Sequence, residues 1–107
     1  MEADYGPKPP ANHNELEKQE ILKILKDAES ARFKFSEQIK KDAIQPSFAS
    51  PSAVPVWLTI IKVNAKNSYG GYTGFKYYIC AWRDGQIFAL NGPLDSDTYF
   101  GFWHYLK

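Results

Sequence analysis

The chain has 107 residues and a formal net charge of +1, with 44% hydrophobic and 23% charged residues. At roughly 150 residues per domain, this length allows one globular domain. The small net charge argues against a nucleic-acid-binding protein, which carries a clearly basic face. No run reaches the ~18 consecutive apolar residues of a membrane-spanning helix. The single cysteine, Cys80, excludes a disulfide within the chain and a thiolate metal cluster.

The first twelve residues contain three prolines and a glycine but no hydrophobic periodicity. They predict a disordered N-terminal arm over residues 1–12, followed by a single α+β domain over residues 13–107. The arm is either a frayed terminus or a tether to a membrane or partner. The acidic, apolar-poor start after Met1 is not a signal peptide. It indicates a cytoplasmic protein or a mature chain whose leader has been removed.

A helix is predicted to begin at Asn14, which would be its N-cap. Glu17, three residues later, would complete a capping-box pair. The helix should end between Asp27 and Ala31. Its apolar stripe is expected to cover the sheet and consists of Leu16, Ile21, Leu22, Ile24, Leu25 and Ala28. Its charged side chains are expected to face water: Glu17, Lys18, Glu20, Lys23 and Lys26.

Residues 32–39 alternate between apolar and polar, with Phe33 and Phe35 on one side, which predicts a half-buried strand. A long loop is predicted from Lys40 to Pro55, because its prolines lack the amide donor that a central strand needs.

Two runs rich in β-branched and aromatic residues, 56–63 and 75–82, predict a central hairpin. Asp84-Gly85 predicts a tight turn into a strand over residues 86–90, which the 91–93 segment (Asn-Gly-Pro) should end. The aromatic tail, residues 94–107, should dock on the sheet or continue it. The predicted fold is α+β, with one N-terminal amphipathic helix packed on a mostly antiparallel sheet of about four strands, in two layers.

The segment between the two central strands is polar and rich in glycine and tyrosine. Such a loop can present binding groups on a rigid scaffold, and tyrosine gives contact area at low entropic cost. The alternative is that its side chains only hold the loop in shape. Stacking of single-stranded nucleic acid is a third possibility, which the small net charge weakens. The candidate ligand-binding residues are Asn64, Lys66, Asn67, Tyr69, Tyr72 and Lys76.

No catalytic residue, metal ligand or cofactor site is predicted. Cys80 and His104 could pair as thiolate and base, but Cys80 lies within a strand, where a cysteine is usually a small buried hydrophobe. His13 and His104 are far apart in the sequence, which argues against a metal site. The glycine-rich run 70–74 lacks the lysine of a phosphate-binding loop.

Three segments resemble a group of small Gram-negative envelope proteins and lipoproteins of unknown function. Residues 4–9 (Asp-Tyr-Gly-Pro-Lys-Pro) are similar to the proline-rich start that follows the lipid-bearing cysteine in that group. Residues 25–33 resemble its Leu-Lys-Asp-Pro-x-Ser-Ala motif, with Ala28 in place of the usual proline. Residues 63–76 match its Val-Asn-Ala-Lys-Asn-Ser-Tyr-Gly-Gly-Tyr-Thr-Gly motif nearly throughout, without the cysteine often found before it.

The resemblance implies a non-enzymatic bacterial envelope protein, exported and lipid-anchored in its native precursor. Its location would be the periplasm or the outer-membrane surface, with membrane contact only through the anchor. It would bind an envelope protein or glycan through the 64–76 loop, and no nucleic acid. The alternative is a soluble interaction module of the immunity or inhibitor type that blocks a protein partner with the same loop.

Overall fold

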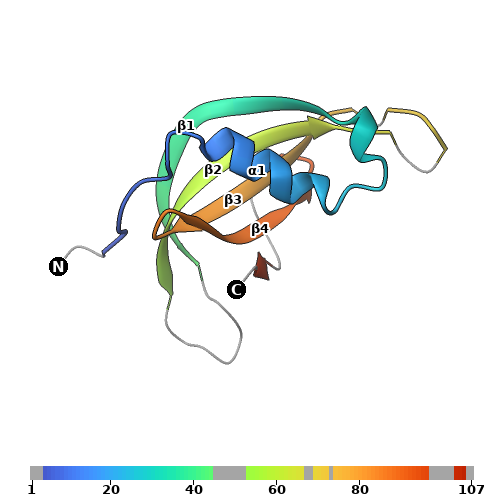
Figure 1. Cartoon of the computed structure of the whole chain (residues 1–107). Coiled ribbons are helices and arrows are strands. Elements are labelled where there is room, and N and C mark those ends of the chain that lie inside the picture. Colours follow the sequence, from blue (N-terminus) through green and yellow to red (C-terminus); the bar gives the residue numbers. More distant parts are fainter. Residues whose placement is uncertain (1–3, 45–52, 67–68, 73, 97–102, 106–107) are drawn as a thin grey trace.

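The computed structural model describes residues 4–44, 53–66, 69–72, 74–96 and 103–105. One α-helix lies across an antiparallel sheet whose strands follow one another in sequence order (Figure 1). The predicted α+β fold, one N-terminal helix followed by a four-stranded antiparallel sheet, is confirmed, and a two-residue strand extends it. The elements are α1 (His13–Leu22), the 3-10 helix η1 (Ala28–Ser30), β1 (Arg32–Ile44), β2 (Val54–Asn64), β3 (Lys76–Arg83), β4 (Gln86–Leu94) and β5 (His104–Tyr105).

Helix α1 begins earlier and ends sooner than predicted. Its N-cap is Asn12, which makes no side-chain capping bond, so the predicted capping pair of Asn14 and Glu17 is wrong. Glu17 lies two positions beyond N3 of this helix, and its carboxyl accepts a hydrogen bond from Thr59 instead. The helix ends at Leu22, and the N–H of Ile24 closes a tight turn on the carbonyl of Ile21 at 3.0 Å. Ile21 is fully buried and Leu25 packs against the same core, whereas Ile24 is 52% exposed, so Ile24 does not belong to the buried stripe.

Strand β1 continues to Ile44, so the prediction of a loop from Lys40 to Pro55 is wrong at both ends. Residues 40–44 pair with residues 54–58 of β2, and a bulge between Phe35 and Ile39 interrupts the pairing. Residues 45–52, the middle of the predicted loop, lie outside the described part of the chain. Phe33 and Phe35 stack on one face of β1 with ring centroids 5.9 Å apart, as their alternation predicts.

Pro55 lies within β2, opposite Ala43, although proline was expected to exclude it from the ladder. Its carbonyl accepts a hydrogen bond from Arg83 Nη1 at 3.1 Å, on the side of β3. The N and O atoms of one strand residue point to the same side. The nitrogen of Pro55, which has no hydrogen to donate, therefore points toward β3. No ladder bond is lost there, because the pairing of β2 with β3 starts at Trp57.

The β3–β4 hairpin has the predicted two-residue turn. Asp84 and Gly85 take φ values of 56° and 76°, which fit the turn that Asp-Gly favours. The predicted end of β4 at residues 91–93 is wrong, because β4 continues to Leu94. Gly92 allows this continuation, since a Cβ atom there would lie 2.7 Å from Tyr78 Cδ1.

Both faces of the sheet carry buried side chains. Successive side chains of a strand point to opposite faces, and β2 and β3 each contain a run of consecutive buried residues. On the face toward α1, Ile21 of the helix packs with Trp57, Ile61, Val63, Tyr78, Cys80, Trp82, Ile87 and Leu90 of the sheet. On the other face lie Ile44, Val56, Leu58, Ile60, Ile79, Ala81 and Ala89. Cys80 is fully buried, which confirms that it is a small core residue.

The described residues 103–105 of the aromatic tail pack on the sheet and continue it, the two placements that the sequence predicted for this tail. Trp103 packs against the face away from α1, and β5 pairs with Ala89 and Leu90 of β4. The rings of Tyr99, Phe100 and Phe102 lie outside the described residues.

Residues 4–8 lie along the end of the sheet that carries the β3–β4 turn. Trp57 Nε1 is 3.1 Å from the carbonyl oxygen of Tyr5, and Arg83 Nη1 donates to the carbonyl of Asp4. The ammonium of Lys8 lies 5.8 Å from the Trp57 ring centroid. These contacts fix where the chain enters α1. The boundary at residue 12 between an arm and a domain stays a prediction.

Candidate functional site

The predicted binding loop connects β2 to β3 at the end of the sheet opposite the β3–β4 turn (Figure 1). Two interactions across the loop hold its shape. Asn64 Oδ1, at the end of β2, accepts a hydrogen bond from the N–H of Gly74 at 3.1 Å. Lys66 and Tyr72 form an isolated antiparallel bridge. The loop is thus closed on itself near its base.

The loop is also attached to η1 through Ser30. The N–H of Lys66 donates to Ser30 Oγ, and the Tyr72 hydroxyl donates to the Ser30 carbonyl, both at 3.0 Å. The Arg32 guanidinium lies 4.9 Å from the centroid of the Tyr72 ring. A cation over an aromatic face is attracted by the ring quadrupole. Tyr72 is therefore held between η1 and β1. This contact fits the alternative in which the side chains of the loop hold it in shape.

Lys76 and Tyr69 differ in their surroundings. Lys76 Nζ lies 2.6 Å from Asp95 Oδ1, and this hydrogen bond and the ammonium charge lower the pKa of the Asp95 carboxyl. Tyr69 is 96% exposed. The structure thus places Asn64, Lys66 and Tyr72 in contacts that hold the loop, and it pairs Lys76 with Asp95. The Tyr69 side chain is set apart by its high exposure. The sixth candidate, Asn67, lies outside the described residues.

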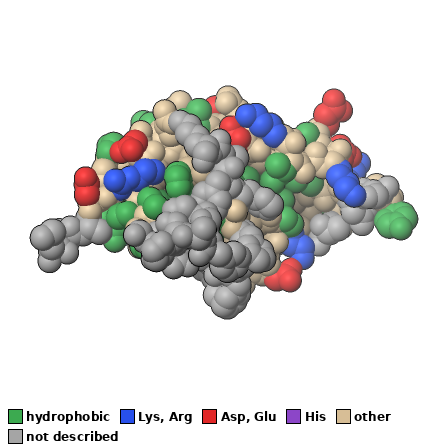
Figure 2. All heavy atoms as spheres, turned by 90° about the horizontal axis from the view of Figure 1, so that it is seen from below, with side chains coloured by type: hydrophobic (Ala, Val, Ile, Leu, Met, Phe, Trp, Pro, Cys, Tyr) green, Lys and Arg blue, Asp and Glu red, His purple; other side chains and the backbone are tan. Residues whose placement is uncertain are grey.

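Charged side chains of both signs are interspersed on the face seen from below (Figure 2). Among the described residues, no group of His, Cys, Asp and Glu side chains is arranged to hold a metal ion. Over the same ranges, no helix combines the length and apolar character needed to cross a bilayer.

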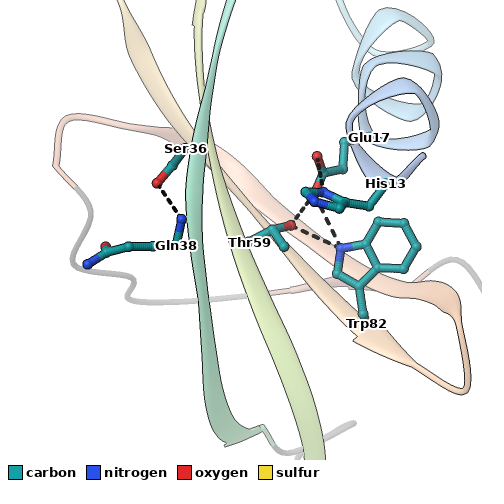
Figure 3. Close-up of polar contacts among 6 residues, drawn as sticks. All are labelled: His13, Glu17, Ser36, Gln38, Thr59 and Trp82. Carbon is teal, nitrogen blue, oxygen red and sulfur yellow. Dashed lines mark hydrogen bonds and ion pairs between the residues drawn. The ribbon is translucent and has the colours of Figure 1, made fainter. Parts of the chain in front are cut away.

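A buried polar cluster joins α1 to the sheet, and the sequence did not predict it. Thr59 Oγ1 donates to Glu17 Oε2 and accepts from Trp82 Nε1 at 3.0 Å (Figure 3). Trp82 Nε1 also lies 3.4 Å from Glu17 Oε2. His13 Nδ1 lies 3.3 Å from the other carboxylate oxygen, Oε1. The prediction that Glu17 faces water is wrong, because these partners satisfy its carboxyl inside the protein.

Two sequence signals point to this cluster. Glu17 lies four residues before Ile21 and thus on the same helical face. Thr59 occupies an inward position of β2 between Trp57 and Ile61. A polar residue at such a position needs a hydrogen-bonding partner. Neither signal, however, identifies Glu17 and Thr59 as partners.

Burial suppresses the reactivity of Cys80, which lies beside the cluster. Burial, followed by the nearby Glu17 carboxyl, raises the pKa of the Cys80 thiol well above its usual value. Because the thiolate is the nucleophile, a raised pKa and full burial make the thiol unreactive. The arrangement attaches α1 to β2 and β3.

The buried carboxyl makes stability depend on pH. Burial raises the pKa of Glu17 above its ordinary value of 4.5. Between the unfolded and folded pKa values the folded state binds more protons, so the free energy of unfolding falls as pH rises through that interval. Glu17→Gln keeps an acceptor for Thr59 but has no titratable group. We expect the free energy of unfolding of this variant not to show the decrease with rising pH. Urea unfolding of both proteins between pH 4 and pH 8 measures it; parallel curves would contradict the prediction.

Comparisons of the chain with protein-family models, with curated proteins and with solved structures find no match.

Proposed function

We propose that the chain is a non-enzymatic binding protein of the bacterial envelope, which binds another envelope component through its 64–76 loop. The observation that carries this proposal is the exposed Tyr69 ring on a loop whose base is fixed by Asn64 and Tyr72. A ring presented on a loop with a fixed base loses less conformational entropy on binding than one on an unattached segment.

The position of the N-terminal segment supports the envelope assignment. Residues 4–6 lie near Trp57 and Arg83, whereas the loop begins after Asn64. At ~3.3 Å per residue, the length of β2 between Trp57 and Asn64 separates these two ends by roughly 20 Å. A chain anchored through its N-terminus would thus present the loop away from the anchor. The resemblance of residues 4–9, 25–33 and 63–76 to envelope lipoproteins points the same way.

The test is an amide NMR titration with solubilised peptidoglycan fragments, followed by a periplasmic extract. We expect shifts or broadening confined to Asn64–Lys76, and Tyr69→Ala should weaken binding at least about tenfold, as for an aromatic hot spot. Ile24→Ala is the matched control, because it removes an exposed apolar side chain from the helix end. Changes elsewhere in the chain, or equal binding by the Tyr69→Ala protein, would overturn the proposal.

A further inference from the structure

A cavity of about 420 Å³ lies beside β1 and β2, on the face of the sheet away from α1. Its lining is rich in hydrogen-bond donors, and no carboxylate belongs to it among the described residues. The lining side chains include Lys34, Ser36, Gln38, Ile60, Lys62 and Tyr77. This volume falls within the range of small-ligand sites. The two lysines of the lining favour a negatively charged ligand.

Two of these donors are lysines held directly opposite each other. Lys34 of β1 pairs in register with Lys62 of β2, and Tyr77 of β3 follows in the same row. Like charges at directly opposed positions destabilise a sheet. The ion pairs between described residues include neither lysine. Lys62 is also the exposed position in the otherwise buried run from Val56 to Val63 of β2.

Aromatic rings hold the two ammonium groups from the side. Lys34 Nζ lies 4.5 Å from the centroid of the Phe75 ring, and Lys62 Nζ lies 5.3 Å from that of Tyr77. A lysine ammonium carries three donors, and a ring face occupies only one side of it. Both groups therefore retain donors for a ligand.

The bulge in β1 shapes the open side of the cavity. Between Phe35 and Ile39 the strand is out of register with β2, and the N–H of Gln38 donates to Ser36 Oγ at 3.1 Å. Figure 3 shows Ser36 and Gln38 on the side of β1 away from α1. Because β1 is an edge strand, an extended chain can approach the cavity along it.

We propose that this cavity binds the carboxylate side chains of an extended acidic peptide segment of a partner protein. The ammonium groups of Lys34 and Lys62 neutralise the carboxylates, and the Ser36 and Tyr77 hydroxyls donate to them. Ile60 packs against the methylene groups of a glutamate. Of the 64–76 loop, Phe75 contacts this site through Lys34, whereas Tyr69 does not belong to the lining.

The test is calorimetry with an acetylated and amidated peptide of alternating glutamate and valine, and with the same peptide carrying glutamine for glutamate. We expect only the glutamate peptide to bind, and more weakly as salt rises. Lys34→Gln and Lys62→Gln should each weaken binding about tenfold, as for loss of a charge-assisted hydrogen bond. Lys40→Gln, an exposed lysine of the same strand outside the lining, is the matched control.

Three results would overturn the proposal: equal binding of the glutamine peptide, an equal loss with Lys40→Gln, or displacement of the peptide by inorganic phosphate at matched ionic strength. Lys62→Gln should unfold at a temperature no lower than the wild type, because it relieves a like-charge pair. A lower unfolding temperature for Lys62→Gln would contradict the claim that Lys34 and Lys62 repel each other. The Tyr69→Ala protein should bind the glutamate peptide normally, which separates failure at the loop from failure at this cavity.

Discussion

Replacing Thr59 by valine is expected to lower the free energy of unfolding by about 2–4 kcal/mol. The valine side chain has a similar shape but no hydroxyl group. The Glu17 carboxyl then loses its donor from Thr59, and Trp82 Nε1 keeps only the contact with Glu17 at 3.4 Å. Because both groups are buried, water cannot replace the lost hydrogen bonds. Urea unfolding at pH 7 measures the change.

Thr59→Ser is the matched control for this prediction, because it removes a methyl group and keeps the hydroxyl. We expect it to lower the free energy of unfolding by about 1 kcal/mol, close to the burial free energy of one methylene group. In a Glu17→Gln background, Thr59→Val should cost less than in the wild type, since a neutral amide is less costly to leave unpaired than a charged carboxylate. Equal costs for valine and serine would show that the hydroxyl does not stabilise the cluster.

Replacing Gly92 by alanine is expected to cost about 2–4 kcal/mol, from overpacking and backbone strain together. The new Cβ atom would lie 2.7 Å from Tyr78 Cδ1 and 2.8 Å from the Tyr77 carbonyl oxygen. The φ of Gly92 is +148°, a value that residues with a side chain rarely adopt. The Tyr77 carbonyl belongs to β3 and cannot move away without disturbing the sheet. Thermal or urea unfolding measures the loss.

Gly71→Ala provides the comparison for Gly92→Ala. A Cβ atom at Gly71 meets no other atom within 4 Å, and its φ is not positive. We expect its effect to stay within about 0.5 kcal/mol, as for most surface substitutions. If the two variants unfold at the same urea concentration, the close approach of β4 to β3 at Gly92 does not constrain the fold.

The parts of the fold that follow from neighbouring residues were predictable. The Asp84-Gly85 turn depends on two adjacent residues with positive φ. The strands on either side of the central loop are long β-branched and aromatic runs, and Cys80 lies within one of them. In each case a few consecutive residues carry the whole signal, so no knowledge of distant partners is needed.

The errors concern residues whose surroundings come from distant parts of the chain. Glu17 has the charge and spacing of a capping residue, but its partners Thr59 and Trp82 follow 42 and 65 positions later. Pro55 is compatible with β2 only because pairing with β3 starts after it. For the candidate site, the sequence identified a shaped loop but not Ser30, whose Oγ and carbonyl accept bonds from Lys66 and Tyr72.

The order of the strands in the sheet bears on how the chain folds. Each strand pairs with the one that follows it in the sequence, from β1 to β5. Pairing therefore proceeds through the closure of successive hairpin loops, whose entropic cost is small compared with that of distant contacts. Docking of α1 is different, because the Glu17 carboxyl accepts hydrogen bonds from two strands, from Thr59 of β2 and Trp82 of β3. The two hydrogen-bond donors to the Glu17 carboxyl are thus brought together by the pairing of β2 with β3.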